Sequence, residues 1–292
     1  MGEATLLYGI GAAKAGTSWL HRYLSLHPEV AMPEPKELHF FDSLEFGGRL
    51  KEVDKTMRRI AMLEMKAETA APERRAALQR RHADLCRYGA LMADEGVGPR
   101  DYAAFLREAA NGRRVVGDIT PAYALLPEAR FREMAGLAPQ TRFVMILRDP
   151  VDRAWSNIRG AAARRAERPE QVAEIAQRIL GRVFSGEATD VIDRSDYRGT
   201  LTRLFNAVPG PHILIEFFER LFETETLTRI CGFLGIAPRP GEADRTVHGG
   251  VRIPLSQESR ARLRDQLAPQ YEYVADRFGA ALPPAWAANM KV

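Results

Sequence analysis

Apolar runs and helical patterns alternate along this chain of 292 residues. Continuous apolar runs bounded by polar or turn residues predict buried strands, because the strands of a parallel sheet are covered on both faces. They lie at residues 6–10, 114–118, 142–147 and 213–217, with a shorter extended segment at 30–32. Amphipathic stretches separate them, so we expect an α/β fold with a central parallel sheet flanked by helices.

The helices between these strands are predicted from apolar spacing and from capping residues. One begins at Thr17 or Ser18, and another begins at Pro150 with Asp149 as its N-cap. The last long helix follows Ser256 as its N-cap and runs to about residue 278. Further helices are expected at about 101–110, 127–135, 169–184, 197–205 and 221–234, with a basic connection at 160–170.

A basic, helical segment interrupts the alternation. Residues 49–87 are rich in Arg, Lys, Glu and Ala and predict one or two surface helices, broken near Pro72. We expect a single domain over residues 1–292 with a helical insertion at about 49–110. Three arginine pairs in it either face an anionic acceptor or lie on a solvated helix face. They are Arg58–Arg59, Arg74–Arg75 and Arg80–Arg81.

The composition indicates the net charge of the protein and the cellular compartment in which we expect it. Charged residues make up 27% of the chain and the net charge is +4. The pI is near 9.2, which fits a polyanionic ligand without requiring one. Cys86 and Cys231 have no metal-ligand spacing, so they favour a reducing compartment over a disulfide framework or a zinc site. With no secretory leader and no membrane span predicted, we expect a cytoplasmic protein.

The stretch 6–27 predicts a phosphate-binding loop. A buried strand leads into the small-residue loop 11–16 and then into a helix start, where backbone N–H groups and the helix dipole favour an anion. Lys14 adds a mobile cation. The arrangement GxxKxGTSWL differs from the usual GxxxxGK[ST], because Lys14 precedes Gly16 by two residues. The alternative is a tight turn that carries a surface lysine.

This loop resembles the 5′-phosphosulfate loop of the sulfotransferases that use 3′-phosphoadenosine 5′-phosphosulfate (PAPS), and the chain is similar to a bacterial member of that family. The resemblance implies a P-loop-like three-layer fold, PAPS as the donor, adenosine 3′,5′-bisphosphate as the product and no metal. It also implies that Lys14 is catalytic. The donor site is then expected to include Ala15, Gly16, Thr17, Ser18 and Trp19.

A second motif, RFVMILRDPVDRAWS, ends the predicted strand at 142–147. Arg148 follows that strand, where α/β sheets bind ligands, and Ser156 lies about two turns into the next helix. A guanidinium fork and a hydroxyl suit a phosphate. The pair is similar to the family's 3′-phosphate motif, although an Arg-Asp-Pro turn alone is a common strand-to-helix link. A later glycine-containing loop adds His248 and Arg252 as candidate donor contacts, with a surface turn as the alternative.

The segment KELHFFD carries candidate acid–base groups. If it is extended, Glu37 and His39 share a face, and either group can remove a proton from an acceptor. Heparan-type sulfotransferases carry a similar E-x-H-F-F-D segment. The resemblance implies that Glu37 is the base, His39 its neighbour and Asp42 a supporting polar residue of the acceptor site. Alternatively, the two phenylalanines are core and the polar residues are ordinary surface groups.

The segment GDITPAY resembles the GEKTPAY segment that lines the active cleft in the same group. Asp118 and Tyr123 are therefore candidate substrate contacts. Ile119 replaces the lysine of the group, so a basic contact to a sulfated glycan is missing and heparan is a weaker candidate for the acceptor. The alternative is a buried aspartate at a strand end.

Together these residues predict in-line transfer of a sulfuryl group from PAPS to a hydroxyl or amine, with positive groups stabilising the leaving phosphate. The acceptor stays open among carbohydrate, lipid, peptide tyrosine and small metabolite, as does the oligomeric state. A P-loop-type nucleotide kinase is one alternative, which the displaced Lys14 opposes. A non-catalytic nucleotide- or nucleic-acid-binding protein is the other. No nucleic-acid partner is expected, because the basic residues are not interleaved with aromatic ones.

Overall fold

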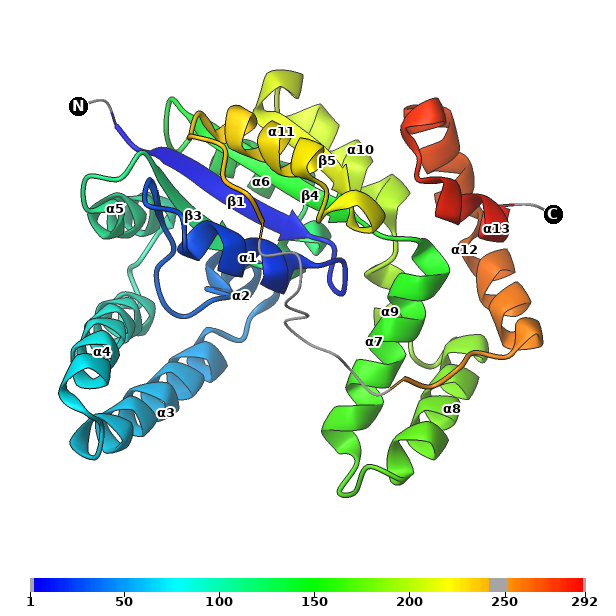
Figure 1. Ribbon diagram of the computed structural model, residues 1–292, viewed down its shortest axis with the longest axis horizontal. Coiled ribbons are helices and arrows are strands. Elements are labelled where there is room, and N and C mark those ends of the chain that lie inside the picture. Colours follow the sequence, from blue (N-terminus) through cyan, green and yellow to red (C-terminus); the bar gives the residue numbers. More distant parts are fainter. Residues whose placement is uncertain (1–2, 242–251, 291–292) are drawn as a thin grey trace.

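The computed structural model describes residues 3–241 and 252–290, and at its centre lies a five-stranded sheet in which every pairing is parallel. The strand order is β2-β3-β1-β4-β5 (Figure 1). The strands are β1 (Thr5–Gly11), β2 (Val30–Ala31), β3 (Val115–Ile119), β4 (Thr141–Leu147) and β5 (Ile213–Phe217). The predicted α/β fold is confirmed, and each strand lies within a residue or so of its apolar run.

β1 lies in the middle of the sheet, covered on both faces. All seven of its residues are buried. Its Tyr8 pairs with Asp118 of β3 on one side and with Phe143 of β4 on the other. A Cβ on Gly9 would lie 2.7 Å from Ile119 Cγ1, so a larger side chain does not fit there. This close packing fixes the position of the carboxyl end of β1 and of the loop that follows it.

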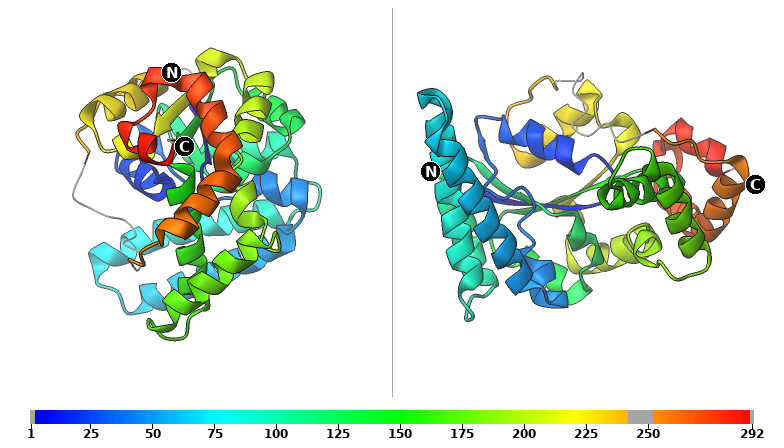
Figure 2. Two further views of the ribbon diagram at one scale, coloured as in Figure 1. Left: turned by 90° about the vertical axis from the view of Figure 1, so that its right-hand side faces the viewer. Right: turned by 90° about the horizontal axis from the view of Figure 1, so that it is seen from below.

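Helices cover both faces of the sheet. α1 (Thr17–Ser25) and α11 (Thr224–Leu234) lie on one face, and α6 (Glu128–Ala135) and α10 (Tyr197–Ala207) lie on the other (Figure 2). Around them lie α2 (Phe40–Phe46), α5 (Pro99–Ala110), α7 (Pro150–Arg165), α8 (Gln171–Phe184), α9 (Asp190–Asp193), α12 (Gln257–Phe278) and α13 (Ala287–Met290). Within the described ranges, no helix combines the length and the apolar character that crossing a membrane requires.

Two predicted helix starts are confirmed by their caps. Asp149 accepts a hydrogen bond from the Asp152 N–H (3.0 Å) at the start of α7. Ser256 accepts one from the Ser259 N–H (3.1 Å) at the start of α12. Each cap satisfies a backbone donor that has no partner inside its own helix.

One local prediction is wrong, and the extended conformation considered for residues 36–42 is not formed. The chain after Gly160 is not a connection, because α7 continues to Arg165 and buries Ala162 in the core. Residues 36–42 are not extended, because α2 begins at Phe40. Neighbouring side chains of a strand point to opposite faces, whereas Phe40 and Phe41 are both fully buried with ring centroids 5.2 Å apart. The helical turn is what allows both rings to enter the same core.

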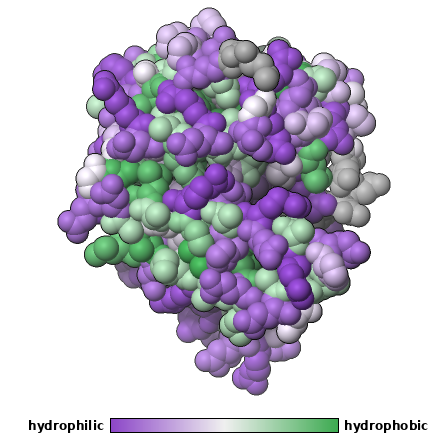
Figure 3. Space-filling model, turned by 90° about the vertical axis from the view of Figure 1, so that its left-hand side faces the viewer, coloured by the Kyte–Doolittle hydropathy of each residue, from purple (hydrophilic) through white to green (hydrophobic). Residues whose placement is uncertain are grey.

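The segment rich in arginine forms a helical hairpin of α3 (Arg49–Glu68) and α4 (Pro72–Ala93), which projects from one end of the sheet (Figure 1). The hairpin has a small apolar cluster of its own, made of Ile60, Leu63, Leu78 and Leu85. α5 differs, because its Tyr102 and Leu106 belong to the main core. Figure 3 views the molecule from the hairpin's side, where hydrophilic side chains border a hollow near the centre of the face.

Candidate active site

The carboxyl ends of β1, β3 and β4 bring the sequence-predicted residues to one edge of the sheet. The loop with Lys14 follows β1, Tyr123 follows β3 and Arg148 follows β4. Because these strands are parallel neighbours, the three segments meet at the same edge. Lys14 and Arg148 are in contact there although they are 134 positions apart in the sequence.

The loop after β1 leaves backbone donors available at the start of α1. Gly16, the N-cap, has a φ of 87°, and a Cβ there would lie 2.6 Å from Leu221 Cδ2, so only glycine fits. No side chain of the described residues caps this helix. The N–H groups of Thr17 and Ser18 therefore have no acceptor within the helix, and with the helix dipole they form an anion site.

Ala15 and Trp19, both predicted to contact the sulfuryl donor, use their backbone N–H groups in hydrogen bonds within the protein. The Ala15 N–H donates to the Ala12 carbonyl (3.1 Å), and the Trp19 N–H donates to the Gly16 carbonyl (2.9 Å). The Trp19 side chain is only 6% exposed and stacks on Tyr23 with ring centroids 5.4 Å apart. Trp19 thus packs α1 into the core and has little exposed surface.

Positive charge gathers around Lys14. The Arg148 guanidinium donates to the Lys14 carbonyl (3.0 Å) and lies over the Phe218 ring, 4.5 Å from its centroid. The Lys14 side chain reaches α7, where a Cβ on Gly160 would lie 3.2 Å from Lys14 Nζ. Partial burial lowers the pKa of Lys14, and the charges of Arg164, Arg148, Arg159 and Arg153 lower it further. Cations held this close together favour an anion among them.

Arg153 joins the loop to α7 from inside the protein. It is fully buried, and its guanidinium donates to Ser195 Oγ (2.8 Å) and to the carbonyls of Ala13 (3.4 Å) and Val191. Burial lowers the pKa of Arg153 to about 10, so the group stays charged at neutral pH. A buried arginine that contacts a loop carbonyl holds that loop in place and adds charge beneath it.

Ser156 lies on the face of α7 that looks toward this loop. It stands three residues after Arg153, which contacts the loop, and four before Gly160, which lies beside the Lys14 side chain, so the three share a helix face. Ser156 is half-buried. Of the two candidates from the late loop, Arg252 is exposed and His248 lies outside the described residues.

A chain of polar contacts links the loop to residues 36–42. Lys36 Nζ donates to Ser18 Oγ (2.7 Å) and to Glu37 Oε1 (2.9 Å). Glu37 Oε2 lies 3.5 Å from His39 Nε2, and His39 Nδ1 lies 2.8 Å from Asp42 Oδ2. Glu37 and His39 meet although the segment is not extended, because the left-handed backbone of His39 (φ 53°) turns the chain.

The charges of Lys36, Glu37, His39 and Asp42 set the protonation states of Glu37 and His39. Burial disfavours charge on Glu37, but hydrogen bonds from His39 and Lys36 outweigh it and lower the pKa of Glu37 to about 2. Burial also disfavours charge on His39, but its hydrogen bonds to Asp42 and Glu37 raise the pKa of His39 to about 10. At neutral pH Glu37 is a carboxylate and His39 is an imidazolium. Of these two groups, only Glu37 can then accept a proton.

Asp118 and Tyr123 are buried supports for this segment, which corrects their prediction as substrate contacts. Asp118 is 1% exposed and Tyr123 is 0% exposed, so neither offers surface to a substrate. Asp118 accepts hydrogen bonds from the hydroxyl groups of Tyr102 (2.7 Å), Thr120 (2.7 Å) and Tyr123 (2.6 Å). Thr120 accepts from the Leu38 N–H (3.0 Å), and Tyr123 accepts from the Phe40 N–H (3.1 Å). Burial raises the pKa of Asp118.

Two residues of this site were not predicted from the sequence. Lys36 had a readable signal, because it stands next to Glu37 in the KELHFFD motif. Arg153 had none, since nothing in a basic helix marks which arginine is buried. Across the described ranges, no group of three or more His, Cys, Asp or Glu side chains is placed to hold a metal ion.

The parallel sheet, the loop with free backbone N–H groups before α1, Arg148 after β4 and the arginines of α7 define an α/β protein of the P-loop-like class. Comparison with protein-family models matches residues 7–239 to the sulfotransferase family, and the chain belongs to this family. Comparison with curated proteins gave no significant match.

Two solved structures share the fold. A sulfotransferase from Alicyclobacillus acidocaldarius is similar over 98% of this chain and 100% of its own, with 19% identity and a TM-score of 0.65. The sulfotransferase domain of the Synechococcus PCC 7002 olefin synthase is similar over 96% of this chain and 95% of its own, with 18% identity and a TM-score of 0.50. At these identities the likeness shows the fold alone.

Proposed function

We propose that this protein transfers the sulfuryl group of PAPS to a hydroxyl or amine of an acceptor. The observation that carries the proposal is the contact of two arginines with the loop before α1, where Arg148 donates to the Lys14 carbonyl and Arg153 to the Ala13 carbonyl. The charges of Arg159 and Arg164 also act on Lys14. A nucleotide with a 5′-phosphosulfate and a 3′-phosphate brings two anionic groups to such a site. Membership of the sulfotransferase family supports this donor.

Separate parts of the site suit the 5′-phosphosulfate and the 3′-phosphate of PAPS. The N–H groups of Thr17 and Ser18 and the Lys14 ammonium would hold the 5′ end, where the helix dipole also points. Arg148 and Ser156 would hold the 3′-phosphate, as the resemblance to the family motif implies. Lys14 would also stabilise the negative charge that develops on the leaving phosphate.

Glu37 is the proposed base. The acceptor oxygen or nitrogen bonds to sulfur while the bond from sulfur to the phosphate oxygen breaks, and Glu37 takes the proton that the acceptor loses. A carboxylate with a pKa of about 2 is a weak base. Lys36 contributes to that low pKa and also contacts Ser18 of the loop, so movement of Lys36 toward a bound phosphate would strengthen Glu37 as a base. The similar E-x-H-F-F-D segment of heparan-type sulfotransferases supports the same assignment.

Calorimetric titration tests the donor assignment. We expect adenosine 3′,5′-bisphosphate to bind about tenfold or more tightly than adenosine 5′-phosphate, because a charge-assisted contact contributes about 1.5–3 kcal/mol. Arg148→Ala should remove this preference. Arg165→Ala, which removes an exposed arginine at the end of α7, should keep it. With labelled PAPS and a screen of acceptor extracts, Lys14→Ala should lower transfer by about a hundredfold or more.

Other outcomes assign the protein to another class. Magnesium-dependent phosphate transfer from ATP, without preference for the bisphosphate, would identify a nucleotide kinase. Salt-sensitive DNA binding without nucleotide binding would identify a nucleic-acid-binding protein. Unchanged bisphosphate affinity in Arg148→Ala would refute the 3′-phosphate assignment.

A further inference from the structure

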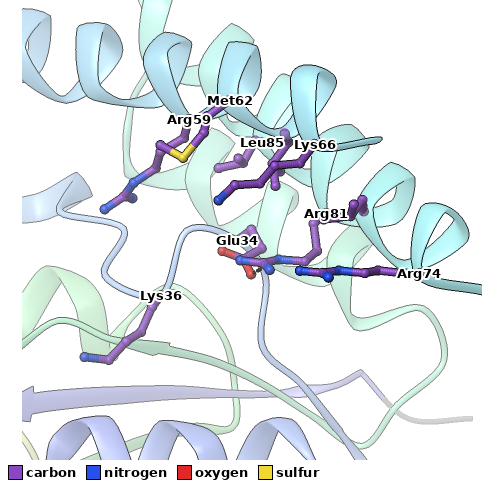
Figure 4. Close-up of a pocket in the computed structure, with 10 residues that line it drawn as sticks. Glu34, Lys36, Arg59, Met62, Lys66, Arg74, Arg81 and Leu85 are labelled. Atoms are coloured by element: carbon purple, nitrogen blue, oxygen red, sulfur yellow. Dashed lines mark hydrogen bonds and ion pairs between the residues drawn. The ribbon is translucent and has the colours of Figure 1, made fainter. Parts of the chain in front are cut away.

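The α3–α4 hairpin and the segment 34–36 line an open pocket of about 360 Å³ (Figure 4). That volume lies at the small end of the range for small-molecule sites, roughly 300–1,000 Å³. The segment 34–36 contributes Glu34 and Lys36 to its lining. α3 contributes Arg59, Met62, Leu63 and Lys66, and α4 contributes Arg74, Leu78, Arg81 and Leu85.

The two helices line the pocket with matching stripes. In α3 the lining positions are i, i+3, i+4 and i+7, and in α4 they are i, i+4, i+7 and i+11, so each set lies on one face of its helix. Each stripe mixes basic with apolar side chains. One member of each arginine pair lines the pocket, and all three of these arginines are exposed. Of the other members, Arg58 pairs with Asp54, Arg75 donates to backbone carbonyls of the turn, and Arg80 does not line the pocket.

Positive charge in the pocket exceeds negative charge. Five cationic side chains line it with one carboxylate, that of Glu34, which is held by Arg81 (2.7 Å). In the part of the chain that the structure describes, no carboxylate forms an ion pair with Arg59, Lys66 or Arg74. Figure 4 shows Arg59 and Lys66 extending from α3 and Arg74 extending from α4, with Glu34 between the two helices and the segment that carries Lys36. Cations gathered in one concave site attract an anionic ligand.

Lys36 connects this pocket to the candidate active site. It lines the pocket, and its side chain extends away from Glu34 (Figure 4). Its ammonium group reaches Ser18 Oγ at 2.7 Å and Glu37 Oε1 at 2.9 Å. A ligand in the pocket therefore lies next to Lys36, which contacts both Ser18 at the start of α1 and Glu37, the proposed base.

We propose that the pocket of the α3–α4 hairpin holds an anionic group of the acceptor, a carboxylate, phosphate or sulfate, with an apolar part of the acceptor against Met62 and Leu63. This inference rests on the proposed sulfuryl transfer and names the class of its second substrate. Arg59, Lys66 and Arg74 bind the anion, and the hydroxyl or amine of the acceptor extends past Lys36 to Glu37.

Matched pairs of small probes test the proposal by calorimetry or ligand-observed NMR. Each pair compares an anionic compound with a neutral one built on the same apolar part: phenyl glucuronide with phenyl glucoside, 4-phenylbutyrate with 4-phenylbutanol, and phenyl phosphate with phenol. We expect the anionic member of at least one pair to bind about tenfold more tightly than its neutral partner. The Arg59→Ala/Arg74→Ala double variant should lose that preference. Arg58→Ala/Arg80→Ala, which removes neighbouring charges outside the pocket, should keep it.

The titration of adenosine 3′,5′-bisphosphate separates this inference from the proposed function. The pocket variant should bind the bisphosphate as tightly as the wild type, because none of its substitutions touches the donor loop. A wild type that does not bind the bisphosphate refutes the proposed donor, whatever the pocket does. No preference for any anionic probe, or an equal loss in both double variants, overturns the pocket proposal while leaving the donor site intact.

Discussion

At the residue scale, the charge state of His39 decides which side chain of the site can act as a base. The imidazole lies between two carboxylates, 2.8 Å from Asp42 and 3.5 Å from Glu37. Both partners favour the protonated ring, and the ring in turn favours ionised Glu37. From residue type alone both Glu37 and His39 were candidate bases, the resemblance implied Glu37, and the contact between them also favours Glu37.

The pKa of His39 can be measured without knowing the acceptor. Because Asp42 and Glu37 raise it to about 10, we expect the His39 ring to stay protonated through pH 9. NMR titration of the six histidines, with His39→Asn to assign the signal, checks this. Asparagine is chosen because it tolerates the left-handed backbone at this position. A His39 midpoint near 6.5 would remove the argument for Glu37.

The same shift predicts a pH dependence of stability. The pKa of His39 is higher in the folded protein, so its contribution is complete below about pH 6.5 and is lost as pH rises toward 10. His39→Asn should therefore lower the free energy of unfolding by about 1–2 kcal/mol at pH 6 and by much less at pH 10. Urea unfolding at both pH values measures the difference. A cost that grows with pH would contradict this linkage.

At the element scale, the start of α7 connects the proposed donor site to the rest of the fold. Asp149 is the N-cap of this helix and is 3% exposed. Its carboxylate accepts from the Asp152 N–H (3.0 Å), the Tyr271 hydroxyl (2.9 Å) and the Asn289 amide (2.9 Å). One side chain thus ties α7 to α12 and α13, directly after Arg148.

Loss of this cap should be costly. Asp149→Ala removes the cap and leaves two buried donors, on Tyr271 and Asn289, without an acceptor, so we expect a loss of about 2–4 kcal/mol. Thermal or urea unfolding measures it. Asp149→Asn keeps one acceptor oxygen and should lose less. If both variants lost the same amount, the negative charge rather than the hydrogen bonds would account for the cost.

At the scale of the whole molecule, the chain has two apolar clusters of unequal size. The large one surrounds the sheet, and the small one holds the α3–α4 hairpin with Ile60, Leu63, Leu78 and Leu85. The hairpin also lines the pocket proposed for the acceptor. The residues of the proposed donor site are therefore held by elements of the larger core, and the proposed acceptor pocket is held by the hairpin with the smaller core.

Hydrogen exchange should show this difference. We expect amides at the far end of the hairpin, near Thr69 and Pro72, to exchange much faster than those of β1 and β4, because few apolar contacts hold that end. Leu78→Ala should speed exchange throughout the hairpin and leave the sheet protected. Equal protection of hairpin and sheet in the wild type would mean that the two unfold as one unit.

Much of the fold and part of the site could be predicted from local sequence. The strands were readable because a buried parallel strand needs a continuous apolar run, and the loop with Lys14 was readable because small residues precede a helix start. The turn at His39 was not readable, since it depends on Phe40 and Phe41 entering one core. The buried roles of Asp118 and Tyr123 depend in the same way on hydroxyl groups supplied by distant elements.

The sequence by itself determined the parallel α/β architecture, the small-residue loop before a helix start and the residues proposed for the chemistry, because these follow from periodicity, capping and residue type. Only the tertiary structure decided the charge state of Glu37 and His39, the place of Lys36 between the loop and the pocket, and which arginines of the hairpin line that pocket. Those properties depend on contacts between segments distant in the sequence, and local patterns do not specify such contacts.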